Sequence, residues 1–93
     1  MTADQIKRMV MGFSADMERV MLEPGNMSKM PQFEELSFHH LMARLANFAR
    51  QVYPYLCDNA WIAAQRACVH VANLAMMIHW HAEQRRLEER GKE

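Results

Sequence analysis

The feature that most constrains this chain is a long C-terminal stretch with nothing in it to end a helix. Residues 59–90 contain neither proline nor glycine, the residues that most often terminate helices. At 1.5 Å per residue such a helix extends about 45–50 Å, which is long for so small a chain. Its first two thirds are apolar on nearly every side, through Trp61, Ile62, Cys68, Val69, Val71, Ala72, Leu74, Met76 and Ile78. Because a helix that is apolar all round must be covered all round, we expect a core shared between two copies of the chain.

A first helix is expected over residues 3–23. Apolar side chains recur there at steps of three and four: Ile6, Met9, Val10, Phe13, Met17, Val20 and Met21. Thr2 is placed to cap the start of this helix, and Pro24-Gly25 is placed to end it. The segment PGNMSKMPQF, residues 24–33, is rich in turn formers and is predicted to be a loop.

A second helix is expected over residues 37–53. One apolar stripe runs along it, formed by Phe38, Leu41, Leu45, Phe48 and Val52. Ser37 is placed to open this helix. Pro54 disfavours helical backbone at Tyr53, so we expect the helix to stop or kink there. Asp58 or Asn59 is then placed to cap the third helix, over residues 59–90.

Together these patterns predict an all-α fold in which residues 1–93 form a single helical domain. Two helices pair antiparallel, the long third helix joins them, and two copies assemble as a dimeric helical bundle. The hydrophobic fraction of 51% favours such a shared core, since a domain this small buries only about 60–65% of its surface by itself.

Composition narrows the partners and the compartment. Eleven basic and eleven acidic residues cancel and are interspersed, so neither nucleic acid nor a membrane surface is an expected partner. The longest apolar run, residues 69–80, is too short for a membrane span, and no signal-peptide h-region opens the chain. Cys57 and Cys68 set no disulfide framework, so we expect reduced thiols and a cytoplasmic location.

The five histidines do not have the spacing of a helical metal site. Two ligands on one helix must lie three or four residues apart to face one ion. His70 and His79 are nine residues apart, and His79 and His81 are two apart. The sequence contains no CxxC, HxxxH or HExxH motif, no nucleophile elbow and no glycine-rich phosphate loop. We therefore expect no metal ligands, no cofactor and no catalytic residue of these kinds.

Two strings in the sequence resemble a known enzyme family. HLMARLANFARQV, residues 40–52, and HVANLAMMI, residues 70–78, are similar to two helices of the all-α nucleoside triphosphate pyrophosphatases, the MazG-like group. The second string is the more specific of the two. The resemblance implies an all-α dimer that binds nucleotides, with magnesium as the family ion, and it places a phosphate contact at Lys29.

The resemblance also implies where the metal-binding acids of that family would lie. In the family, carboxylates on two facing helices hold magnesium, which positions water for cleavage of a pyrophosphate. The equivalent positions here are Asn47, Phe48 and Gln51 on one helix and Ala67 and His70 on the other, and none is acidic. The resemblance therefore implies the fold together with an impaired catalytic site.

Three interpretations of these positions stay open. In the first, the ancestral site is lost, and Asn47, Gln51 and His70 are ordinary polar residues. In the second, a nucleotide or another anion still binds without efficient hydrolysis, through a set of cations: Lys29, Arg44, Arg50 or Arg66. In the third, His70 and the amides hold a softer metal than magnesium, because imidazole suits transition metals.

The function expected from these features is that of a divergent, catalytically impaired MazG-like protein that retains nucleotide or partner binding. The alternative is a non-enzymatic helical module for dimerisation or protein interaction, such as a small accessory or mobile-element protein. Ten methionines favour adaptable apolar surfaces in either case, and they specify no ligand.

Overall fold

The computed structural model describes residues 1–29 and 37–91, and all regular secondary structure in these ranges is helical. The helices are α1 (Ala3–Met21), α2 (Pro24–Met27), α4 (Phe38–Cys57) and α5 (Trp61–Gly91). The expected all-α class is therefore confirmed. The chain groups into two compact units, Met1–Leu36 and Ser37–Glu93. The single domain expected for residues 1–93 stays a prediction.

In the first unit, the start of α1 is fixed by a capping box. The Thr2 hydroxyl accepts the Gln5 N–H at 3.2 Å, and the Gln5 side-chain oxygen accepts the Thr2 N–H at 2.8 Å. Two backbone donors that the helix leaves unpaired are thereby satisfied, as expected for Thr2. The helix ends at Met21, two residues before the expected end at Glu23.

The segment predicted to be a loop contains a one-turn helix, α2. Pro24 begins it, which suits proline because the first helical residue needs no N–H donor. The Asn26 side-chain amide donates to the Val20 carbonyl at 2.7 Å and so satisfies an oxygen near the end of α1. The prediction of a loop was therefore wrong for residues 24–27, and its last part, residues 30–33, lies outside the described residues.

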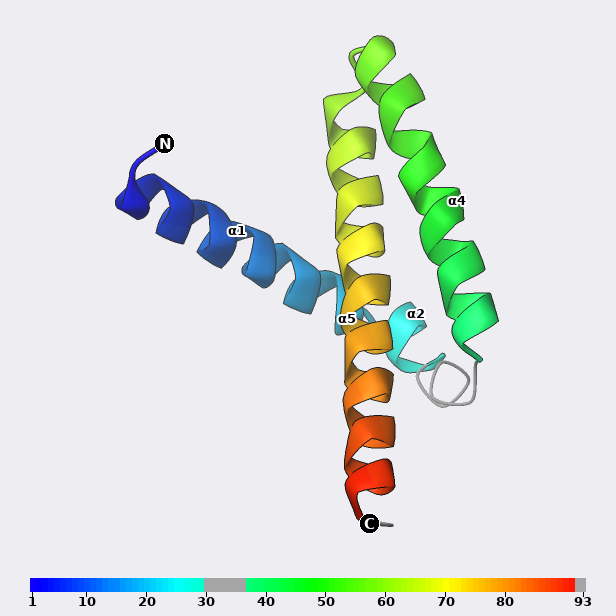
Figure 1. The fold of residues 1–93 in the computed structure, drawn as a ribbon. Coiled ribbons are helices and arrows are strands. Elements are labelled where there is room, and N and C mark those ends of the chain that lie inside the picture. Colours follow the sequence, from blue (N-terminus) through cyan, green and yellow to red (C-terminus); the bar gives the residue numbers. More distant parts are fainter. Residues whose placement is uncertain (30–36, 92–93) are drawn as a thin grey trace. The chain divides into compact units, whose positions relative to one another are not determined.

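The second unit is a helical hairpin of α4 and α5, which run antiparallel side by side (Figure 1). As predicted, Ser37 caps α4: its hydroxyl accepts the His40 N–H at 3.4 Å. The predicted stop at Pro54 was wrong, because α4 continues through Pro54 to Cys57, and the alternative of a kink there stays a prediction. Pro54 lacks an N–H, but its carbonyl still accepts the Asp58 N–H at 3.1 Å. Since only three residues of α4 follow Pro54, a single donor is lost in the last turn.

Asn59 closes the hairpin by ending α4, not by capping α5. Its φ of 58° is left-handed, a conformation that asparagine tolerates better than most residues. The Ala60 N–H reaches back to the Tyr55 carbonyl at 2.8 Å, and the Asn59 N–H reaches the Leu56 carbonyl at 3.2 Å. This pair of bonds is a Schellman motif. The expected capping of the third helix by Asp58 or Asn59 was therefore wrong: Asp58 is the C-cap of α4, and α5 begins at Trp61.

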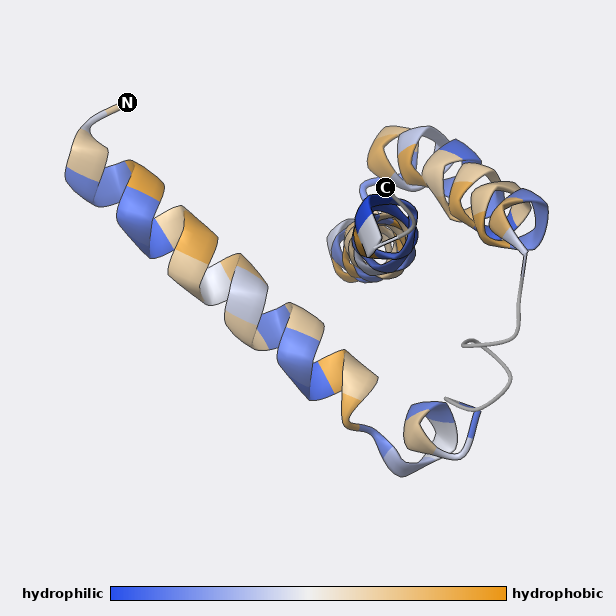
Figure 2. Cartoon of the chain, turned by 60° about the horizontal axis from the view of Figure 1, so that its bottom comes forward, coloured by the Kyte–Doolittle hydropathy of each residue, from blue (hydrophilic) through white to orange (hydrophobic). Residues whose placement is uncertain are grey.

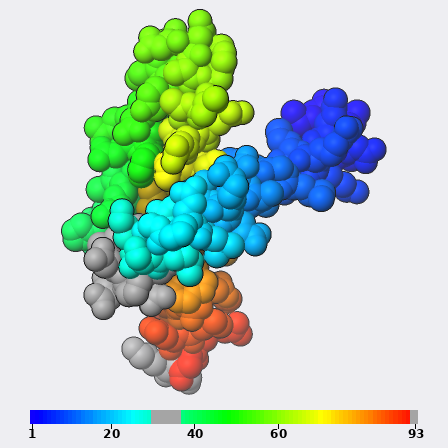
Figure 3. Space-filling view, turned by 180° about the vertical axis from the view of Figure 1, so that it is seen from behind, coloured from blue at the N-terminus to red at the C-terminus, as the bar shows by residue number. Residues whose placement is uncertain are grey.

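The two helices of the hairpin are held together along their length. Leu41 of α4 is fully buried, and on α5 Ala64, Ala67 and Leu74 are buried. At the far end, the Phe38 ring lies edge-on to His81, with ring centroids 6.4 Å apart. The Arg85 guanidinium lies over the same Phe38 ring at 4.8 Å. The last turns of α5 therefore extend past the start of α4 (Figures 1 and 3).

This C-terminal part of α5 is polar and solvated. Arg86 donates to the Glu83 carboxylate at 2.6 Å, and this hydrogen bond lowers the pKa of Glu83 below its ordinary value. Both side chains are substantially exposed, so the pair adds little to stability.

Many apolar side chains remain exposed in both units. On α1 they recur along one side of the helix (Figure 2): Ile6, Met9, Val10 and Phe13 are 45, 54, 57 and 40% exposed. On α5, Trp61, Ile62, Met76 and Trp80 are 57, 80, 44 and 52% exposed. Within residues 1–29 and 37–91, no helix combines the length and apolarity that a membrane crossing requires.

Candidate functional site

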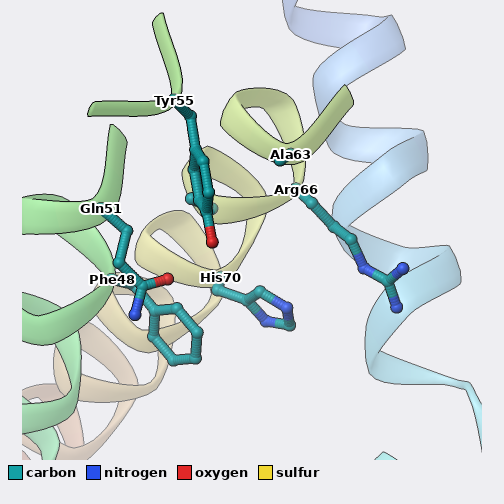
Figure 4. Close-up of a pocket in the computed structure, with 7 residues that line it drawn as sticks. Phe48, Gln51, Tyr55, Ala63, Arg66 and His70 are labelled. Carbon is teal, nitrogen blue, oxygen red and sulfur yellow. The ribbon is translucent and has the colours of Figure 1, made fainter. Parts of the chain in front are cut away.

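A hollow of about 180 Å³ lies between α4 and α5 within the hairpin (Figure 4). Helical spacing brings its walls together, since residues three, four or seven apart share a face of a helix. From α4 the lining residues are Phe48, Gln51 and Tyr55, and from α5 they are Ala63, Arg66, Ala67 and His70. The hollow therefore belongs to one compact unit.

A stacked pair of rings forms one wall of this hollow. The Phe48 and His70 ring centroids are 4.5 Å apart, and the ring planes meet at 23°. Both residues are half-buried. The short side chains of Ala63 and Ala67 leave the space beside the pair open. The wall therefore places two aromatic rings beside a cavity.

Polar groups converge on the same space. The Gln51 amide and the Tyr55 hydroxyl point toward the region beside His70, whereas the Arg66 guanidinium is directed away from them (Figure 4). An amide supplies both a donor and an acceptor, and a phenol supplies one of each. The hollow thus offers stacking and hydrogen bonding to a small ligand.

None of the lining residues is a carboxylate. Magnesium is held in proteins by hard oxygen ligands, usually one or two carboxylates together with substrate phosphates. Among the residues that the structure describes, no three His, Cys, Asp or Glu side chains gather closely enough to hold a metal ion. The donor set of the hollow suits an organic ligand better than a hydrated dication.

Three of the histidines contact three different side chains. His70 stacks on Phe48, and His81 packs edge-on to Phe38. The Nδ1 atom of His40 lies 2.8 Å from the Ser37 hydroxyl. Each of these three rings thus has its own local contact. Cys57 and Cys68 are free thiols on the exposed surface of their helices.

The hollow unites two of the four predicted ligand-binding residues. Gln51 and His70 both line it. Asn47 lies one turn before Gln51 on α4, is exposed, and does not line the hollow. Lys29 is exposed and belongs to the other compact unit, Met1–Leu36. Of the five positions where the resembled family has acids, four line the hollow: Phe48, Gln51, Ala67 and His70.

The cations proposed for anion binding separate in a similar way. Arg66 lines the hollow. Arg50 lies two positions from Phe48, hence on another side of α4, and its Nε donates to the Ala46 carbonyl at 3.4 Å. Arg44 is on α4 but is not a lining residue. Arg66 is therefore the cation placed to meet a ligand that occupies the hollow.

Sequence reasoning missed Tyr55 as a site residue. Tyr55 lies seven positions after Phe48, so a continuous helix places both residues on one face. The expected stop at Pro54 left Tyr55 outside that helix. A proline near the end of a helix costs one donor and does not have to end the helix, and that possibility was the available signal.

No protein-family profile, curated protein or solved structure matches this chain. The likeness to the MazG-like group therefore rests on the two sequence strings, and the site rests on its own geometry.

Proposed function

We propose that this chain is a divergent MazG-like protein that binds a nucleotide or a related anionic ligand in the α4–α5 hollow without releasing pyrophosphate. One observation carries the proposal: Gln51 and His70, positions that hold acids in the resembled family, line the same hollow. That hollow keeps stacking and hydrogen-bonding groups but has no carboxylate. The site therefore has groups that can bind an organic ligand, but it has no carboxylate that could position magnesium.

The loss of hydrolysis follows from charge. A metal that activates water must be held by ligands that offset its charge, and carboxylates do this in magnesium sites. Gln51 offers a neutral amide oxygen, and an imidazole is a poor ligand for a hard cation such as magnesium. A nucleotide bound here would meet neither a positioned metal nor an activated water.

The first test measures pyrophosphate release from each deoxynucleoside triphosphate with magnesium present. We expect none above the rate without protein. A parallel thermal-shift series with nucleotides tests binding, and we expect equal stabilisation with magnesium or with a chelator. Robust magnesium-dependent turnover would overturn the proposal of an impaired site.

We further propose that the chain works as a homodimer. The exposed apolar side chains of α5 support this, because Ile62 and Trp61 are 80% and 57% exposed although they lie on a helix expected at the centre of a core. A second copy that covers these side chains would remove their apolar surface from water.

The second candidate is a helical interaction module with no small-molecule ligand. The apolar row on α1, formed by Ile6, Met9, Val10 and Phe13, favours it. The same thermal-shift series separates the candidates: if no nucleotide stabilises the chain under either condition, the interaction module is the better description.

A further inference from the structure

We infer that the hollow recognises a single-ring planar heteroaromatic group, such as the base of a pyrimidine nucleoside, and leaves any phosphates outside. This inference rests on the proposed function, namely that the hollow binds a ligand. The inference starts from a difference in residue type at the site. In the resembled family these positions carry metal-binding acids, whereas here they hold a stacked aromatic pair, Phe48 and His70.

The size of the hollow limits what it can enclose. Pockets for drug-sized ligands span roughly 300–1,000 Å³. A cavity of about 150 Å³ holds one benzene ring. The hollow measures about 180 Å³, so one six-membered ring with small substituents fits and a whole nucleotide does not. A purine base or a triphosphate would have to remain partly in solvent.

The walls of the hollow match such a ring in chemistry. Both rings of the Phe48–His70 pair line the hollow, and every base has a π-face that stacks on aromatic side chains. The Gln51 amide pairs a donor with an acceptor, which is the pattern on the edge of a pyrimidine base. The Tyr55 hydroxyl, directed to the same space, adds a second polar contact (Figure 4).

Arg66, the cation among the lining residues, is placed to contact a ligand group that lies outside the hollow. Arg66 lines the hollow, but its guanidinium is directed away from Phe48 and Gln51 (Figure 4). A charged substituent on the ring would therefore meet Arg66 outside the hollow. Phosphates are expected to modulate affinity and not to supply most of it.

The test is calorimetric titration of the full chain, in chelator, with six probes: cytidine, uridine, the triphosphate of each, adenosine and inorganic triphosphate. We expect at least one pyrimidine nucleoside to bind, and its triphosphate to bind within about tenfold of the nucleoside. We expect adenosine to bind more weakly, and inorganic triphosphate neither to bind nor to displace the nucleoside.

Variants at Phe48 test the stacking itself. We expect F48L to weaken nucleoside binding by roughly 5- to 150-fold, the loss typical of removing one stacking ring, whereas F48Y retains it. F48L keeps an apolar side chain in the wall, and circular dichroism checks that it folds. Tyr53→Ala is the matched control, since Tyr53 is also aromatic, lies on α4 and is 75% exposed.

The outcomes separate the two proposals. If inorganic triphosphate competes with full nucleotide affinity, or if F48L binds like the unaltered chain, the ring-recognition inference is wrong while the proposed function stands. If no nucleoside or nucleotide binds at all, the proposed function is wrong, and so is the inference that rests on it.

Discussion

At the scale of single residues, Leu41 carries more of the hairpin core than any neighbour on its helix. Its exposed fraction is 0%, and it lies on the same stripe of α4 as Phe48. The next residue, Met42, is 51% exposed. Two adjacent apolar side chains therefore have opposite surroundings, because successive residues on a helix point about 100° apart.

Leu41→Ala is expected to lower the free energy of unfolding by about 2–5 kcal/mol. The substitution removes buried methyl groups and leaves a cavity that the surrounding side chains fill only in part. Met42→Ala is the control and should change stability by less than about 1 kcal/mol, since it loses little buried surface. Urea unfolding followed by circular dichroism measures both, and equal losses would contradict the packing described.

The residues of the hollow lead to a second prediction, a designed metal site. In the double variant Q51E/H70D, two carboxylates should line one hollow, where they repel each other unless a cation joins them. Millimolar magnesium is expected to raise the melting temperature of this variant and to leave that of the unaltered chain unchanged. The single variant Q51E is the control. A double variant that is indifferent to magnesium would argue against two acids being able to share this space.

At the scale of elements, the hairpin depends on how α4 ends. Asn59 adopts a left-handed backbone, and the N–H groups of Asn59 and Ala60 reach back into the last turn of α4. This reversal sends α5 back along α4 and sets which residues of the two helices meet. The pairing of Phe48 with His70 is therefore a consequence of a turn more than ten residues from either ring along the chain.

Asn59→Ala is expected to destabilise the chain by about 1 kcal/mol, because alanine pays the steric cost of left-handed backbone that asparagine tolerates. Asn59→Gly, the matched variant, should be neutral or stabilising, since glycine adopts this conformation freely. Differential scanning calorimetry checks the order: a loss of 1 kcal/mol lowers the melting temperature of a domain this size by roughly 4–8 °C. An alanine variant as stable as the glycine variant would contradict a strained Asn59.

At the scale of the whole molecule, the exposed apolar side chains point to assembly. The mass of one chain is 10.9 kDa, and such a small domain leaves a large part of its surface uncovered. Ile62 and Trp61 stand 80% and 57% exposed on α5. Covering them with a second copy would remove apolar surface from water at little cost to either hairpin.

Light scattering at micromolar concentration is therefore expected to give about twice the mass of one chain. Ile62→Lys should shift the equilibrium toward the monomer, because a buried, unpaired ammonium opposes association. Gln84→Lys is the control: it adds the same charge at an exposed position in the polar C-terminal part of α5, far along the helix from Ile62. A stable monomer of the unaltered chain would refute the dimer.

The capping residues of α1 and α4 were predicted correctly from the sequence. Thr2 and Ser37 begin α1 and α4 as expected, because an N-cap needs only a hydroxyl and the N–H groups within the next three residues. The wrong predictions at Pro54 and Asn59 concern positions where the surrounding residues determine whether a helix continues. Pro54 was expected to end a helix that continues to Cys57, and Asn59 was expected to begin a helix although it follows the end of one.

By itself, the sequence determined that this chain is helical, because apolar periodicity and capping act over a few residues. Only the tertiary structure decided that Gln51 and His70, 19 positions apart (70 − 51), line one hollow and that Asn47 does not. The physical reason is that the meeting of α4 and α5 depends on the turn at Asn59 and on the packing around Leu41. Helical periodicity predicts which residues share a face of one helix. It does not predict which residues of the other helix that face contacts across the hairpin.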